Sequence, residues 1–76
     1  MNDRVYKLTT MIAERISALQ SDGYTLIAKS TSTNWGMWKL RHKSNGNRIS
    51  IVADFNSGGM LQRTNDKLVY DGPIQP

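Results

Sequence analysis

The chain offers few side chains that could carry out catalysis. His42 is the only histidine, Glu14 is the only glutamate, and there is no cysteine. The absence of cysteine excludes a disulfide framework, a thiolate nucleophile and a cysteine-ligated zinc or iron–sulfur site. Asp54, Asp66 and Asp71 fall at expected strand ends and turns, where aspartate forms local hydrogen bonds. We therefore predict a protein that is not an enzyme and that holds neither a cofactor nor a metal ion.

Positive charge is the more distinctive property of the chain. Ten Lys and Arg residues against six Asp and Glu residues give a formal net charge of +4 and a pI near 9.8. Such a balance favours acidic partners, namely nucleic acid, anionic lipid or an acidic protein surface. The partner we predict is nucleic acid, or else an acidic or nucleic-acid-binding protein. The cations form a binding site only if they gather on one face. Whether they do depends on the helix and strands that position them.

One helix is predicted at the start of the chain, over residues 2–20. Apolar residues recur there at spacings of three and four, which places them on one stripe of a helix. Asn2 is suited to cap the N-terminus, and Gly23 is suited to the left-handed conformation that ends many helices. The stripe consists of Val5, Leu8, Ile12, Ile16 and Leu19.

The rest of the chain has the composition of β-strands separated by turns. The β-rich segments are residues 24–30, 37–43, 48–55, 60–63 and 67–70. We predict an α+β fold, with one N-terminal helix packed on one face of a three- to five-stranded antiparallel meander sheet. Residues 1–72 are expected to form a single small domain, followed by a flexible C-terminal tail over residues 73–76.

The dipeptide Asn45-Gly46 predicts a two-residue type I′ turn, because Asn-Gly between alternating segments is the strongest short hairpin signal. That turn would place Lys43 opposite Arg48 and His42 opposite Ile49. Since side chains alternate, the two strands would then have one apolar and one cationic face. The predicted apolar face carries Trp38, Leu40, His42, Ile49, Ile51 and Ala53. The predicted cationic face carries Lys39, Arg41, Lys43, Arg48, Ser50 and Val52.

The cationic face is the candidate binding site. Two like charges directly opposite each other destabilise a sheet, and a bound anion would offset that repulsion. The alternative is that these exposed cations are solvated and discourage edge-to-edge aggregation. Trp35, in the loop before the second strand, is placed to stack on a base or to anchor a protein partner. The predicted anion contacts are Lys39, Arg41, Lys43 and Arg48, with Arg63 joining them if the next hairpin continues without a bulge.

The order of elements resembles two RNA-directed architectures. A helix, then Gly23-Tyr24 and a strand, then Gly36 and the segment 41–52, is similar to the first part of the double-stranded-RNA-binding architecture and to the HicA-type messenger-RNA interferases. The resemblance covers about half the chain and implies contact with RNA. Those toxins carry a histidine soon after the equivalent glycine, where this chain has Met37 and Trp38. Both groups also close with a second helix, so the resemblance does not imply nuclease activity.

We therefore predict a small non-enzymatic binding module that presents a basic sheet face to nucleic acid or another polyanion. The alternative is a protein-interaction regulator or inhibitor, of the kind that phages and mobile elements encode, which binds and blocks a partner protein. No apolar run is long enough for a membrane span, so we expect a cytoplasmic protein with no membrane partner. A chain of 76 residues buries only a small core, which favours a homodimer.

Overall fold

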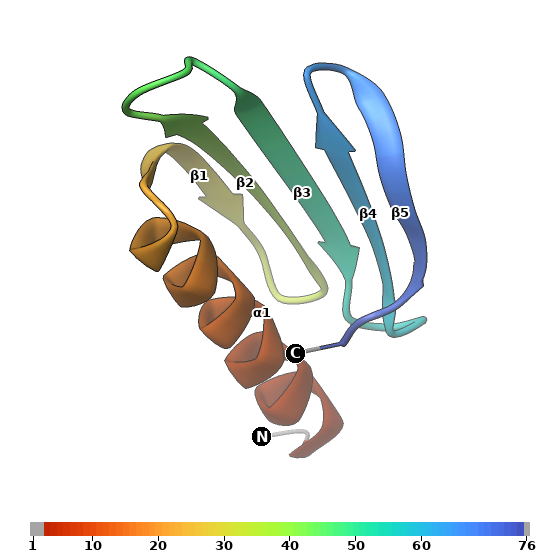
Figure 1. Ribbon diagram of the computed structural model, residues 1–76. Coiled ribbons are helices and arrows are strands. Elements are labelled where there is room, and N and C mark those ends of the chain that lie inside the picture. Colours follow the sequence, from red (N-terminus) through yellow and green to blue (C-terminus); the bar gives the residue numbers. More distant parts are fainter. Residues whose placement is uncertain (1–2, 76) are drawn as a thin grey trace.

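The computed structural model describes residues 3–75, and it consists of one helix followed by an antiparallel sheet (Figure 1). The elements are α1 (Asp3–Ser21), β1 (Tyr24–Thr31), β2 (Trp35–His42), β3 (Arg48–Asp54), β4 (Gly59–Thr64) and β5 (Lys67–Pro73). The five strands lie in the order β1-β2-β3-β4-β5, each antiparallel to its neighbour. The predicted α+β meander is confirmed. The predicted N-cap, Asn2, lies outside the described residues.

The core lies between α1 and one face of the sheet. Ile12 and Ile16 are the buried residues of the helix. They belong to one cluster with Leu40 and Ile51, whose side chains have no exposed surface. Burial of this apolar surface is the main favourable contribution to folding. The other members of the predicted helix stripe pack at the margin of the cluster: Val5, Leu8 and Leu19.

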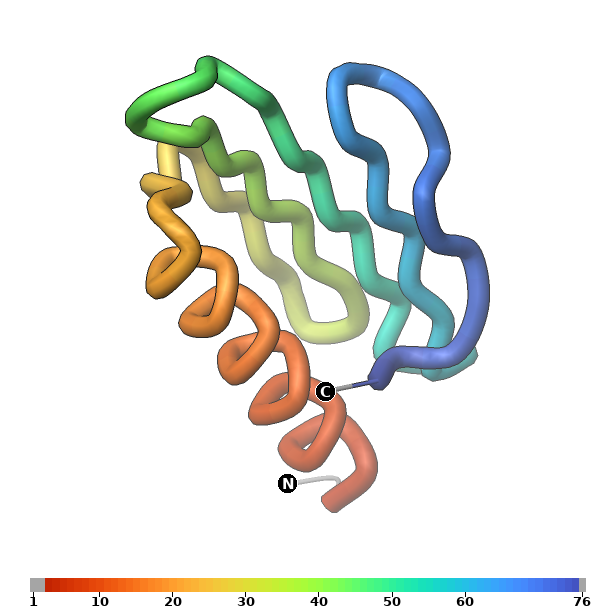
Figure 2. The backbone as a smooth tube through the Cα atoms, viewed as in Figure 1, coloured from red at the N-terminus to blue at the C-terminus, as the bar shows by residue number. Residues whose placement is uncertain are grey.

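The helix lies lengthwise along one face of the sheet (Figure 2). Gly23, with φ of +103°, ends α1 and leads into β1, while Leu8 near the other end lies beside Gly58 of the β3–β4 turn. Between these ends, Arg15 donates hydrogen bonds of 2.9 and 2.5 Å to Oε1 of the buried Gln62 on β4. No element within residues 3–75 covers the opposite face of the sheet, which we call the open face.

The β2–β3 turn differs from the two-residue turn predicted at Asn45-Gly46. The amide of His42 donates to the carbonyl of Asn47 at 2.8 Å, so these residues close a four-residue loop, 43–46. Gly46 has φ of +74°, but a type I′ turn also needs positive φ at Asn45, which does not have it. Nδ1 of His42 accepts the amide of Ser44 at 3.1 Å and thereby stabilises the longer loop.

The longer loop shifts the predicted β2–β3 register by two residues. Arg41, and not Lys43, lies opposite Arg48, while Leu40, and not His42, lies opposite Ile49. Because side chains alternate with a period of two, a shift of two residues leaves the residues within β2 and β3 on their predicted faces, whereas Lys43 falls outside β2. The predicted sorting of apolar and cationic side chains is therefore confirmed, although the predicted pairs are wrong. The buried members of the apolar face are Trp38, Leu40, Ile49, Ile51 and Ala53.

A two-residue turn occurs instead between β4 and β5. Asn65 and Asp66 have φ of +51° and +68°, and they connect the paired residues Thr64 and Lys67. Asparagine and aspartate tolerate this left-handed conformation better than other residues with side chains. The two-residue turn that was expected at the Asn-Gly dipeptide is therefore found at the Asn-Asp dipeptide.

The C-terminal residues of the described chain are packed. Pro73 is the last residue of β5. The side chain of Ile74 is 5% exposed, and its amide donates to the carbonyl of Gly58 at 2.8 Å. Pro73 and Ile74 are therefore part of the domain rather than of the tail predicted from residue 73.

Candidate functional site

The open face brings together four of the predicted anion contacts. Alternate residues of β2, β3 and β4 point to this face, because their neighbours point into the core. The β3–β4 ladder runs without a register shift, which is the condition for Arg63 to join the cations of β2 and β3. All four side chains are exposed, and we call them the cationic patch: Lys39, Arg41, Arg48 and Arg63.

The cationic patch occupies two neighbouring rows of the ladder. Arg41 is paired with Arg48 in one row. In the next row Ser50 is paired with Lys39 on one side and with Arg63 on the other. Directly opposed residues in an antiparallel pair have Cα atoms about 4.5–5.5 Å apart, and successive rows on one face are separated by about 6.6 Å. Four positively charged residues therefore lie on three adjacent strands, with Lys39 and Arg63 about 9–11 Å apart at their Cα atoms.

The small side chain of Ser50 leaves a hollow within the cationic patch. The hollow has a volume of about 290 Å³, and Lys39, Arg48 and Arg63 line it together with Ser50. Asp66, from the β4–β5 turn, also lines it. Lysine and arginine donate charge-assisted hydrogen bonds, and the arginine fork matches the geometry of phosphate and carboxylate oxygens. Ile27, Leu40 and Ile49 complete the lining, so the hollow offers three cationic side chains to an anion, beside the one carboxylate of Asp66.

Lys43 is not part of the cationic patch. It lies in the loop 43–46, where its amide donates to the carbonyl of Gly23 at 3.0 Å. Its side chain is exposed and borders a shallow depression with Arg41 and His42. The prediction that Lys43 faces Arg48 is wrong, because β2 ends at His42 and the charge of Lys43 lies at the turn.

An apolar row crosses the open face next to the cations. Met37 on β2 is paired with Val52 on β3, which is paired with Leu61 on β4. We call these three residues the apolar row. Val52 is 38% exposed. Val52 was predicted on this face, and Met37 follows from the same alternation as Lys39. Leu61 was not predicted, although extending the alternation from Arg63 would have found it.

Trp35 lies beyond the apolar row, at the far end of the open face from the cationic patch. It is the first residue of β2, paired with Asp54, and not a residue of the preceding loop as predicted. Its side chain is 43% exposed, whereas that of Trp38 is 7% exposed beneath the helix. The exposed indole offers an aromatic surface to a ligand or partner.

Acidic side chains lie at the Trp35 end of the open face. Asp54 is exposed at the end of β3, and Asp71 on β5 is paired with Leu61. The carboxylate of Asp54 accepts the amide of Asn56 at 2.9 Å, so it also caps the β3–β4 turn. The cations therefore lie at one end of the open face, with Asp66 beside them, apolar side chains cross the middle, and Asp54 and Asp71 lie at the other end.

His42 has a structural position and not an exposed catalytic one. Its Nε2 lies 3.0 Å from the carbonyl oxygen of Asp22, and its Nδ1 accepts the amide of Ser44. The ring also packs edge-on against Tyr24, with 4.8 Å between the ring centroids. Because Nδ1 accepts a hydrogen bond, Nε2 is the nitrogen that donates to the Asp22 carbonyl. Both ring nitrogens are thus engaged in joining the β2–β3 turn to the end of the helix.

The described residues, 3–75, contain no group of three His, Asp or Glu side chains placed to hold a metal ion. Within the same residues, α1 is not apolar enough over its length to cross a membrane. Compared with known proteins, the chain matches no family model, no curated protein and no solved structure. The resemblance to RNA-directed architectures gains no support from these comparisons, and the functional argument rests on the open face.

Proposed function

We propose that this protein is a non-enzymatic binding module that holds nucleic acid, or another polyanion, on the open face of its sheet. The cationic patch contacts phosphates, and Trp35 provides a surface on which a base can stack. The observation that carries the proposal is the direct pairing of Arg41 with Arg48, beside the row that holds Lys39 and Arg63. Phosphate contacts of this kind position a nucleic acid and specify little of its sequence.

The Arg41–Arg48 pair supports an anionic ligand on energetic grounds. Like charges directly opposite each other in a sheet are destabilising, by roughly 0.2–1 kcal/mol. A phosphate oxygen between two guanidinium groups replaces that repulsion with two charge-assisted attractions. The neighbouring hollow, of about 290 Å³, is lined by Lys39 and Arg63 and adds further donors to the same ligand.

The spacing along β2 suits a chain-like ligand. Lys39 and Trp35 are four residues apart on the same face, which corresponds to about 13 Å along a strand. A polyanion whose phosphates contact the cationic patch can therefore reach Trp35 only if another of its units extends along the strand. The carboxylates of Asp54 and Asp71 repel phosphates from the Trp35 end, so that end favours a base over a phosphate.

Fluorescence anisotropy with a labelled 20-nucleotide strand and with the matching duplex tests this proposal. We expect both to bind, with Arg41→Gln/Arg48→Gln weakening the affinity at least tenfold. A matched control is Lys7→Gln/Lys67→Gln, which also removes two positive charges. Lys7 lies on α1, and Lys67 is the first residue of β5, where it is paired with Thr64. Equal weakening by both double variants would mean that net charge, and not the cationic patch, determines binding.

A protein partner is the second candidate function. The observation that favours it is the apolar row, which lies on the open face with Val52 38% exposed and is followed by Trp35 at 43%. Exposed apolar patches with a polar rim are typical of protein interfaces. Because the cationic patch lies at one end of this face and Asp54 and Asp71 at the other, a second copy of the chain has complementary charges for such a contact.

Affinity purification of the tagged protein, with and without nuclease treatment, separates the two candidates. Co-purified nucleic acid supports the first, and a protein retained after nuclease supports the second. Sedimentation velocity over a range of concentrations identifies a second copy of the chain as the partner. Under the second candidate, Trp35→Ala or Met37→Ala abolishes binding of the protein partner. Under the first, duplex binding survives both substitutions and falls with the number of charges removed.

A further inference from the structure

A bulge in β1 turns a lysine toward the helix. Leu26 is paired with Leu40 and Ala28 with Lys39, so Ile27 is an extra residue in the ladder. Tyr24 and Leu26 face the core before the bulge, and regular alternation would place Ala28 there next. Because of the extra residue, Lys29 is paired with Trp38 and points to the helix side. Bulges commonly re-aim a side chain in this way near binding sites.

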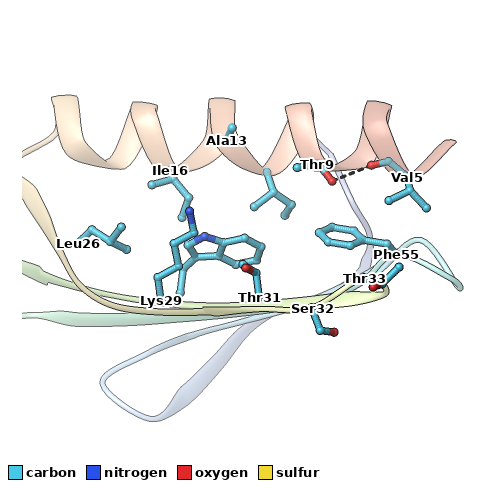
Figure 3. Close-up of a pocket in the computed structure, with 12 residues that line it drawn as sticks. Val5, Thr9, Ala13, Ile16, Leu26, Lys29, Thr31, Ser32, Thr33 and Phe55 are labelled. Atoms are coloured by element: carbon cyan, nitrogen blue, oxygen red, sulfur yellow. Dashed lines mark hydrogen bonds between the residues drawn. The ribbon is translucent and has the colours of Figure 1, made fainter. Parts of the chain in front are cut away.

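Lys29 lines an open groove between α1 and β1 (Figure 3). The groove has a volume of about 450 Å³, within the range of small-molecule sites. Thr9 and Ala13 form its helix wall, and Lys29 and Thr31 form its strand wall. Four of the apolar residues that line it are almost fully buried and form its floor: Ile12, Ile16, Trp38 and Phe55.

The groove combines an apolar interior with one positive charge. Among residues 3–75, Lys29 is the only charged residue that lines the groove, and no acidic residue of that range lines it. The hydroxyl of Thr9 is already bonded to the carbonyl of Val5 at 2.8 Å. Further hydroxyl groups at this end of the groove belong to Thr31, Ser32 and Thr33. A ligand that fits this chemistry has an apolar body for the floor and a single anionic group for the ammonium of Lys29.

We propose that this groove binds a small amphiphile with one anionic head group, of the class of medium-chain carboxylates. The apolar chain lies against Trp38 between α1 and β1, and the carboxylate accepts hydrogen bonds from Nζ of Lys29. The groove lies on the helix side of the sheet, so the inference does not depend on the nucleic-acid proposal for the open face. The competing explanation is that the aliphatic stem of Lys29 simply covers the indole of Trp38.

Tryptophan fluorescence tests the proposal directly. In a Trp35→Phe background, Trp38 is the single tryptophan and reports on the floor of the groove. Decanoate and decyltrimethylammonium have the same chain length and opposite charges, and both are titrated below micelle formation. We expect a saturable change in Trp38 emission with decanoate and at least fivefold weaker binding of decyltrimethylammonium.

Two further substitutions complete the test. Lys29→Gln should lower the affinity for decanoate about fivefold, since an exposed ion pair contributes modestly to binding. The affinity for decyltrimethylammonium should not fall. The control Lys7→Gln should change neither. Ala13→Leu, at an exposed helix position with little change in helix propensity, should fill the groove and abolish decanoate binding without unfolding the protein. The proposal is overturned by an unchanged Trp38 signal, by equal binding of the two head groups, or by decanoate binding that survives Ala13→Leu.

Discussion

Arg41 lies directly opposite Arg48 in the β2–β3 ladder, on the sheet face that α1 leaves uncovered. Both side chains are exposed. Solvation weakens the repulsion between them, but it does not turn the pairing into a stabilising one. On the proposed function, the pair is a cost to the free domain that a bound anion offsets.

Removal of one charge from this pair should make the protein more stable and less able to bind. For Arg48→Gln we expect the free energy of unfolding to rise by up to about 1 kcal/mol, because the cross-strand repulsion disappears. Urea denaturation monitored by tryptophan fluorescence measures this change. Lys67→Gln, at an exposed position opposite Thr64, should change stability by less than about 0.5 kcal/mol. A clear loss of stability in Arg48→Gln would show that Arg48 supports the fold.

The salt dependence of binding should report the number of cations involved. If four phosphates are neutralised, the logarithm of the association constant should fall with the logarithm of salt concentration with a slope of about −3.6 on duplex DNA and about −2.8 on a single strand. The double variant Arg41→Gln/Arg48→Gln should halve that slope. Anisotropy titrations between low and moderate salt measure it. A wild-type slope near zero would exclude phosphate contacts as the basis of binding.

His42 should matter for stability and not for nucleic-acid binding. His42→Ala removes the acceptor for the Ser44 amide and the donor to the Asp22 carbonyl, which lie at 3.1 and 3.0 Å. Loss of these hydrogen bonds should cost about 1–3 kcal/mol of folding free energy. Urea denaturation gives the cost, and anisotropy below the unfolding transition should give wild-type affinity. A large loss of affinity in the folded variant would assign His42 to the site.

Two glycines should respond differently to a methyl group. A Cβ at Gly36 would lie 2.3 Å from Cη2 of Trp38, whose ring is held beneath the helix. Gly36→Ala should therefore destabilise the protein by about 1–3 kcal/mol through overpacking. Gly46 has open space around it but a φ of +74°, so Gly46→Ala should cost about 1 kcal/mol through backbone strain alone. Thermal unfolding measures the loss of stability in both variants. The tryptophan fluorescence of the folded protein should change only in Gly36→Ala, because only that methyl group meets Trp38.

Trp35→Ala distinguishes a stacked single strand from a duplex held by charge. Base stacking on an aromatic side chain contributes about 1–3 kcal/mol per base, so the variant should weaken single-strand binding about five- to 150-fold. Duplex binding should change little, because the bases of a duplex are already stacked on one another. Parallel titrations of both ligands measure the difference. An equal loss of affinity for the single strand and for the duplex would show that Trp35 does not act by base stacking.

The helix and the strands were predictable because their signals are local. The stripe that includes Ile12 and Ile16 sets the helical period and its buried side. The predicted faces of β2 and β3 are correct for a different reason. The predicted register was wrong by two residues, and an even shift leaves each strand residue on the same face. Had the loop 43–46 been one residue longer or shorter on one side, Leu40 and Lys39 would have exchanged faces.

The features that could not be predicted depend on contacts between distant residues. The length of the β2–β3 turn follows from the position of His42 against Asp22, a residue twenty positions earlier. The bulge at Ile27 has no dipeptide signature, and it alone determines that Lys29 points toward the helix. Sequence periodicity describes each strand separately, whereas these details are decided when the strands meet the helix.

The central claim is that the cationic patch, and not net charge, holds a polyanion. The most direct measurement is the affinity of Arg41→Gln/Arg48→Gln for a 20-nucleotide strand and its duplex, set against Lys7→Gln/Lys67→Gln at the same ionic strength. We predict at least a tenfold loss in the first variant, with unfolding free energy unchanged or raised, and a loss below threefold in the second. Equal affinities of the two variants, or no measurable wild-type binding at low salt, would contradict the claim.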